Sequence, residues 1–219
     1  MKTLAVITGE RRLVNPFELY DLNDDLRIIV CRCCFKDQLV RRLKKLDASG
    51  YIAEEDMHLP FKRYDGTGVF CFKLPMLIKK LVKVKNISTN SVAVVGSNDS
   101  MSDALFENIA HIFREFYIIS TDYDYAFRQA ERLLCEYGIA AHTDEPDAMC
   151  DVEVFAGNDF CGLGRCLVNF DTTYEINHGY DLPVKVDSRA FCQALFECDI
   201  ITEMQLKGYG ITIGGILDD

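Results

Sequence analysis

The residues that could do chemistry in this sequence gather where short apolar segments of its second half end. The apolar run 92–95 is followed by Gly96 and by a polar turn that contains Ser97, Asn98 and Ser100. Hydroxyl and amide groups can hydrogen-bond phosphate oxygens, and a helix that begins after such a turn adds the positive end of its dipole. The pattern therefore indicates a place where an anionic group could bind.

A carboxylate stands at the end of the next apolar run. Asp122 lies 26 residues after Gly96 and closes the segment 117–120. At about this spacing, a carboxylate can bind the hydroxyls of a ribose, which would favour NAD over NADP. Asp122 also precedes an amphipathic segment and could cap that helix instead. Both roles are open.

A third polar group follows the predicted strand 151–155. Gly157 and Asn158 come next in the chain and would share the ligand site if the runs form one parallel sheet. Further along, Asp159 and His178 could perform acid–base chemistry if the fold brought them within ~3 Å. Their separation in the sequence gives no evidence for this contact.

The elements that must position these residues alternate between strand and helix. Leu105, Ile109, Ile112 and Phe116 recur at helical spacing and predict a helix over 102–116, and the segment 126–137 predicts a second helix that ends at Gly138. Strands are predicted at 92–95, 117–120, 139–142, 151–155 and 166–170. This alternation favours a parallel sheet with right-handed crossovers.

In these features residues 90–170 resemble the Rossmann-type NAD(P)-binding superfamily, and especially its amino-acid-dehydrogenase-like members. The resemblance is carried by Val92–Gly96, by the strand that ends at Asp122, and by 149–157. It implies an NAD or NADP cofactor bound near these residues and an oxidoreductase of unknown substrate. The residues that it places at the cofactor are Gly96, Ser97, Asn98, Ser100, Asp122, Gly157 and Asn158.

The turn after the first strand departs from the pattern of that superfamily. It has one glycine where three are usual, and it carries Asp99 while Asp103 opens the following helix. A carboxylate ~4 Å from a phosphate charge costs on the order of 4 kcal/mol at an effective dielectric constant of about 20. The alternative function is therefore a non-catalytic regulatory or protein-interaction module on a degenerate Rossmann-like fold.

The first part of the chain predicts a smaller α/β lobe. Strands are expected at 4–8, 26–31 and 69–72, with helices over 36–48 and 75–84 and a polar connection at 86–90. The chain ends with a predicted helix over 188–198 and a strand within 208–216. The expected fold class is α/β, with a Rossmann-like parallel sheet in the C-terminal lobe and a smaller α/β N-terminal lobe.

The charge changes sign near residue 90. Residues 1–90 carry 17 Lys and Arg against 11 Asp and Glu, and the remaining residues carry 7 against 23. We therefore expect a basic lobe at 1–88 and an acidic Rossmann-like domain at 89–219. Lobes of opposite charge could attract each other in a homodimer. The acidic lobe argues against a nucleic-acid partner.

Composition sets the remaining expectations. With 49% hydrophobic and 26% charged residues the chain is expected to be globular, and no apolar run approaches the ~20 residues that cross a bilayer. We expect a cytoplasmic location and no membrane partner. Among the ten cysteines only Cys31 and Cys34 have the C-x-x-C spacing, and neither a second such pair nor an i, i+4 pair of histidines is present to complete a tetrahedral site. We therefore expect no metal and interpret the cysteines as buried apolar residues.

Overall fold

The chain forms two compact units. In the computed structural model the described residues are 1–12, 14–32, 35–54, 57–96, 103–155, 161–169, 172 and 174–213. Unit 1 comprises Met1–Val69 and Glu175–Thr212, and unit 2 comprises Phe70–Tyr174 and Ile213–Asp219. Both units are therefore discontinuous: residues 70–174 of unit 2 are inserted into unit 1, and residues 213–219 at the end of the chain return to unit 2.

This division differs from the expected boundary between residues 88 and 89. The helix α2 (Phe70–Lys85) packs against α3 (Asp103–Ile109) and so belongs to unit 2. The helix α5 (Ser188–Glu197) packs against β4 (Gly50–Ala53) and so belongs to unit 1. The lysines of α2 thus leave the basic lobe, and acidic residues of 175–212 join it.

The charges of the two units consequently have the same sign. Unit 1 carries 15 Lys and Arg against 17 Asp and Glu, and unit 2 carries 9 against 17. Both units are net negative, so the attraction between oppositely charged lobes no longer supports a homodimer.

Unit 1 is built on a four-stranded sheet with strand order β2-β3-β1-β4. The strands β1 and β3 are parallel, as are β1 and β4, whereas β2 is antiparallel to β3. The bounds of the elements around the first sheet are β1 (Lys2–Ile7), β2 (Phe17–Asp21), β3 (Leu26–Cys31), α1 (Lys36–Lys45) and the 3-10 turn η1 (Thr67–Val69). The later elements are β10 (Tyr174–Asn177), α6 (Glu203–Gly208) and β11 (Gly210–Ile213), with β10 and β11 forming a two-stranded sheet.

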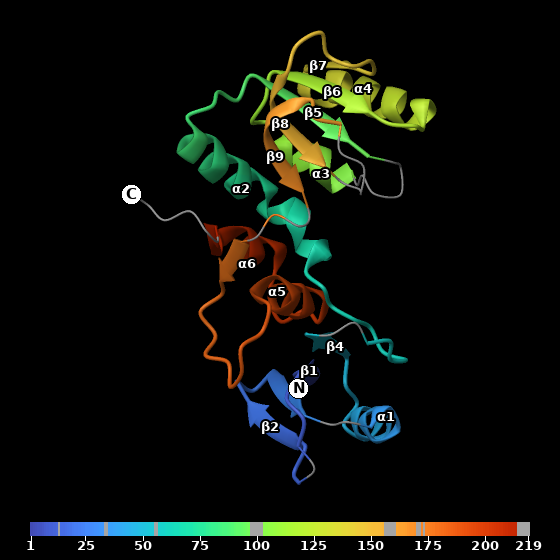
Figure 1. Ribbon diagram of the computed structural model, residues 1–219, viewed down its shortest axis with the longest axis vertical. Coiled ribbons are helices and arrows are strands. Elements are labelled where there is room, and N and C mark those ends of the chain that lie inside the picture. The colour runs from blue at the N-terminus through green and yellow to red at the C-terminus, as the bar shows by residue number, and fades with distance from the viewer. Residues whose placement is uncertain are drawn as a thin grey trace. The chain divides into compact units, whose positions relative to one another are not determined.

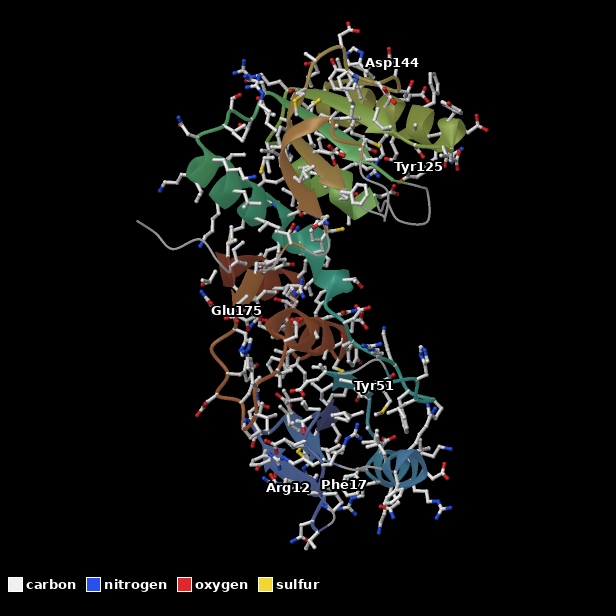
Figure 2. The ribbon with its side chains drawn as sticks, in the orientation of Figure 1. Arg12, Phe17, Tyr51, Tyr125, Asp144 and Glu175 are labelled. Carbon is white, nitrogen blue, oxygen red and sulfur yellow. The ribbon has the colours of Figure 1, made fainter. Side chains whose placement is uncertain are left out.

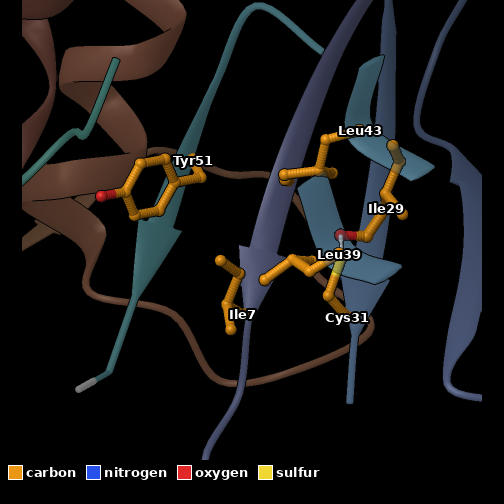
Figure 3. Close-up of a cluster of buried hydrophobic side chains, with 7 residues drawn as sticks. Ile7, Ile29, Cys31, Leu39, Leu43 and Tyr51 are labelled. Carbon is orange, nitrogen blue, oxygen red and sulfur yellow. Dashed lines mark hydrogen bonds between the residues drawn. The ribbon is translucent and has the colours of Figure 1, made fainter. Parts of the chain in front are cut away.

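The core of unit 1 forms where α1 covers this sheet. Leu39 and Leu43, four residues apart, lie on the same face of the helix and are buried. They pack in one cluster with Ile7 of β1, Ile29 of β3 and Tyr51 of β4 (Figure 3). The predicted helix over 36–48 thus exists, and its apolar spacing determines which face meets the sheet.

Unit 2 contains a five-stranded sheet in which every neighbouring pair is parallel, with strand order β7-β6-β5-β8-β9 (Figure 1). Its strands are β5 (Ser91–Val95), β6 (Glu115–Ile119), β7 (Ala140–His142), β8 (Cys150–Phe155) and β9 (Gly164–Asn169). The helix α4 (Tyr123–Tyr137) packs against β6 and β7, and α2 packs against α3 and β9. This order confirms the expected Rossmann-like parallel sheet.

Two predicted elements were wrong. Residues 69–72 were expected to form a strand, but they lie in η1 and the start of α2. The apolar positions there continue the helical spacing of α2, whose Phe70, Leu74 and Leu77 are buried. The helix predicted over 102–116 ends at Ile109, because Phe116 is buried in β6 rather than on a helix face.

The connection between β8 and β9 is held by a buried carboxylate. Glu153 is 0% exposed, and its Oε2 accepts hydrogen bonds from the N–H groups of Leu163 (2.6 Å) and Gly164 (3.0 Å). Its Oε1 accepts a hydrogen bond from the N–H of Cys161 at 3.3 Å. Because an unpaired buried charge is costly, these three donors stabilise Glu153 while it fixes the chain that enters β9.

Gly164 should be essential for the close approach of β9 to β8. A Cβ at this position would lie 2.3 Å from the backbone nitrogen of Glu153, so a strand would have to move. We expect Gly164→Ala to lower the free energy of unfolding by about 2–3 kcal/mol in urea denaturation. Gly208→Ala is the control, since a Cβ there meets nothing within 4 Å. Equal stability of the two variants would contradict the packing described for Gly164.

Asp151 should make the stability of unit 2 depend on pH. Burial acts to raise the pKa of Asp151, but hydrogen bonds from Ser88 and from the N–H groups of Asn90 and Ser91 outweigh it and lower that pKa. The stabilisation is therefore present above the unfolded pKa of about 3.9 and is lost as pH falls through the folded pKa. We expect Asp151→Asn to be less stable than wild type at pH 7, with the difference shrinking below about pH 4.

Chemical denaturation at a series of pH values measures this difference. Asp144→Asn, which changes an exposed carboxylate of the same unit, serves as the control. A constant difference between wild type and Asp151→Asn from pH 7 to pH 3 would show that the carboxylate of Asp151 does not act through its charge.

Candidate functional site

The strand order of unit 2 reverses between β5 and β8. From β5 the chain proceeds to β6 and β7 on one side, and it then crosses to β8 and β9 on the other. In open parallel sheets, a crevice for ligands forms beyond the carboxyl ends of the strands at such a reversal. Here those ends are Val95 of β5 and Phe155 of β8, which pair in register.

Gly96 continues β5 at this edge. Its N–H donates a hydrogen bond to the carbonyl oxygen of Ile119 at 3.1 Å, which extends the pairing of β5 with β6. The residue is partly exposed at the end of a buried strand. The structure thus places Gly96 at the carboxyl edge of the sheet, next to the end of β6.

Five predicted site residues lie outside the described residues. They belong to the two segments that follow the carboxyl ends of β5 and β8. These residues are Ser97, Asn98, Ser100, Gly157 and Asn158. Their role in the site stays a prediction.

Asp122 caps α4, as one of its two expected roles requires. Its Oδ1 accepts a hydrogen bond from the N–H of Tyr125 at 2.9 Å, and its own N–H donates to Ser120 Oγ at 3.1 Å. The other carboxylate oxygen has no hydrogen-bond partner among the described residues. Capping therefore uses one oxygen and leaves the second for a ligand.

The carboxylate at the start of α3 is compensated by partners from α4. Gln129 Nε2 donates a hydrogen bond to Asp103 Oδ1 at 2.8 Å, and Arg132 lies 3.3 Å from the same oxygen. Arg132 also pairs with Glu107 and Glu136, and these hydrogen bonds and charges raise its pKa further above its usual value. The expected repulsion between Asp103 and a phosphate is thereby reduced.

These α4 partners were not identified from the sequence. Gln129 is buried, and it lies on the helix face of Ala126 and Leu133. A polar side chain on an apolar face was the available signal, because a buried amide requires a partner. The labelled Tyr125 marks the first turn of α4 beside this group (Figure 2).

His178 and His142 both pack against aromatic rings. His178 lies in unit 1, where its ring contacts Phe191 with centroids 4.9 Å apart and its Nδ1 accepts a hydrogen bond from the N–H of Tyr180. Burial lowers the pKa of His178 and so favours the neutral ring. His142 stacks on Tyr117 with centroids 4.9 Å apart. Asp159, considered as a partner of His178, lies outside the described residues.

Two findings on the described residues concern metal ligands and cysteines. No group of three or more His, Cys, Asp or Glu side chains there could hold a metal ion. The eight described cysteines form no disulfide. The expectation of burial holds for Cys31, Cys150, Cys166, Cys192 and Cys198 but is wrong for Cys135 and Cys161, which are exposed. Within the described ranges, no helix is both long and apolar enough to span a membrane.

No family model and no curated protein matches this sequence. Among solved structures the chain is similar to a shikimate 5-dehydrogenase-like protein, at 11% identity and a TM-score of 0.32, over 71% of this chain and 66% of that chain. It is similar to quinate dehydrogenase from Corynebacterium glutamicum in complex with NAD, at 14% identity and a TM-score of 0.34, over 71% of this chain and 70% of that chain.

A third similar structure is L-tryptophan dehydrogenase from Nostoc punctiforme, at 10% identity and a TM-score of 0.31, over 70% of this chain and 56% of that chain. At these TM-scores we draw no argument about activity from the likenesses. The strand order of unit 2 is what identifies its fold: a Rossmann-like parallel sheet of the kind expected from the sequence.

Proposed function

We propose that unit 2 binds a nucleotide cofactor, NAD or NADP, at the carboxyl edge of its parallel sheet. The observation that carries the proposal is the reversal of strand order between β5 and β8. Dinucleotides bind at this reversal in doubly wound sheets, because two chain segments leave the edge in opposite directions and open a crevice. The site residues proposed are Gly96, Ser97, Asn98, Ser100, Asp122, Gly157 and Asn158.

The charges of the described residues are compatible with a phosphorylated ligand. Arg132 and Gln129 hold the carboxylate of Asp103, so this charge is partly neutralised before a phosphate approaches. Asp122 offers its second oxygen to a ribose while the first caps α4. A carboxylate at that point favours the free ribose hydroxyl of NAD over the additional phosphate of NADP.

We further propose that the protein is an oxidoreductase. A nicotinamide cofactor at this edge would supply hydride transfer, while this chain would bind and orient it. We assign no catalytic residue and no substrate. A regulatory or protein-interaction module is the outcome in which the site binds no nucleotide.

Binding should appear as thermal and chemical stabilisation of the whole chain. We expect NAD at 100 times its dissociation constant to raise the free energy of unfolding by about 2.7 kcal/mol. NADP and ATP tested alongside distinguish a dinucleotide site from a general nucleotide site. The proposal fails if none of the three changes the unfolding midpoint at millimolar concentration.

Asp122 can be tested without confusing capping with binding. Asparagine caps helices about as well as aspartate does, so Asp122→Asn should keep the stability of the free protein while weakening NAD at least tenfold. Asp122→Ala should lose both the cap, at a cost of about 1 kcal/mol, and the ligand. Titration calorimetry measures the affinity of each variant.

The matched control is Asp187→Asn, which alters the N-cap of α5 in unit 1. It should leave NAD affinity unchanged. Unaltered NAD affinity in Asp122→Asn would remove Asp122 from the ribose site, even if the protein binds NAD.

A further inference from the structure

Unit 1 has a surface cavity that is widely open to solvent, in addition to the edge described above. It has a volume of about 370 Å³ and is lined by Phe17 of β2 and by four side chains of α1: Gln38, Arg41, Arg42 and Lys45. This volume is within the range of sites for small molecules. No acidic residue lines the cavity.

The helix spacing gathers these groups on one face. Residues 38, 41, 42 and 45 stand at positions i, i+3, i+4 and i+7, so their side chains project together. Leu39 and Leu43 occupy the opposite face, where they are buried against the sheet. The amphipathic packing of α1 therefore presents three cations and one amide to the cavity.

Phe17 holds one of these cations in place. The guanidinium carbon of Arg42 lies 5.8 Å from the centroid of the Phe17 ring, a cation–π contact. Phe17 itself packs against the buried core cluster of unit 1, and this contact limits the movement of its ring. In Figure 2 the labelled Phe17 lies beside α1. Arg42 is thus pre-oriented before any ligand arrives.

The charges of the cavity are uncompensated within the described part of the chain. Arg41, Arg42 and Lys45 form no ion pair there, and the Nε of Arg42 is buried without a hydrogen-bond acceptor. Two arginines of β3 and its end do form ion pairs. Arg27 pairs with Asp21, and Arg32 pairs with both Glu10 and Glu18. A buried polar atom of an arginine without an acceptor is unfavourable until an anion satisfies the group.

The hydrogen-bond donors of the cavity indicate which kind of anion would fit it. Two guanidinium groups provide planar forks of N–H donors that match phosphate or carboxylate oxygens, and Lys45 adds a point charge. Three cations with no acid suit a dianion better than a single carboxylate. We propose that this cavity binds the phosphate group of a small phosphorylated molecule. This site is independent of the nucleotide site proposed for unit 2.

A nucleic acid is the competing occupant, and the charge of the chain disfavours it. Both units are net negative, so a polyanion that extended beyond the cavity would be repelled. A small phosphorylated molecule avoids this repulsion because it contacts only the cationic face of α1.

Titration calorimetry with inorganic pyrophosphate on the full chain tests the proposal, at constant ionic strength set with sodium chloride. We expect saturable binding that is weakened about tenfold by Arg41→Gln and by Arg42→Gln, since each removes a charge-assisted hydrogen bond. Phe17→Leu should weaken binding less, because it keeps the apolar packing and removes only the ring that orients Arg42. Circular dichroism confirms that each variant is folded.

The matched control is Lys44→Gln, which removes one charge of the same helix from outside the cavity lining. It should change the affinity by less than twofold. The proposal is overturned if pyrophosphate shows no saturable binding, or if Lys44→Gln and Arg42→Gln weaken it equally. It is also overturned if single-stranded RNA binds through Arg41 and Arg42 while pyrophosphate does not. Arg41→Gln and Arg42→Gln should weaken pyrophosphate binding and leave NAD affinity unchanged, which separates this site from the one proposed for unit 2.

Discussion

The carboxylate of Glu153 is the interaction on which the sheet of unit 2 depends. Only eight residues join β8 to the parallel strand β9, although parallel strands usually need a dozen or more between them. So short a return leaves backbone N–H groups without a partner in the ladder. Glu153 accepts hydrogen bonds from three of them, and Gly164 lets the strands approach. These hydrogen bonds tie the segment that enters β9 to β8.

The same principle organises the edge where the nucleotide is proposed to bind. Asp103 and Asp122 stand at the starts of α3 and α4, and both are engaged by neighbouring groups of the protein. Negative charge at a helix start is favourable because it meets the positive end of the helix dipole. The protein thus uses these carboxylates structurally first. An anionic ligand would therefore compete with these carboxylates for the positive potential at the helix starts. Gln129 and Arg132 on α4 reduce this competition at Asp103.

Sequence patterns predicted the parts of the fold that local spacing controls. The predicted strands at 92–95 and 151–155 correspond to β5 and β8. Gly138 was predicted to end a helix, and it ends α4 in the left-handed conformation. The parallel arrangement also followed from the alternation of elements. In contrast, residues 69–72 were misassigned because an apolar run of four residues fits a strand as well as the first turn of a helix.

What sequence could not predict depends on contacts between distant residues. The pairing of Asp103 with Gln129, and of Glu153 with the N–H of Leu163, requires knowing how two elements pack. The division of the chain was hidden for the same reason. Charge changes sign near residue 90, but packing assigns α2 to one unit and α5 to the other. For Asp122, the sequence left helix capping and ribose binding open, and the structure shows the cap.

The insertion of residues 70–174 between the two segments of unit 1 affects the order in which the sheets can form during translation. Residues 1–69 emerge first, yet α5, which packs on β4 and η1, is made only after residues 70–174. All five strands of the parallel sheet are therefore synthesised before unit 1 can be completed. Since parts of a chain can fold as they emerge, the parallel sheet of unit 2 can form before α5 reaches the sheet of unit 1. Until residues 188–197 are synthesised, the four-stranded sheet of unit 1 lacks the packing of α5 on β4.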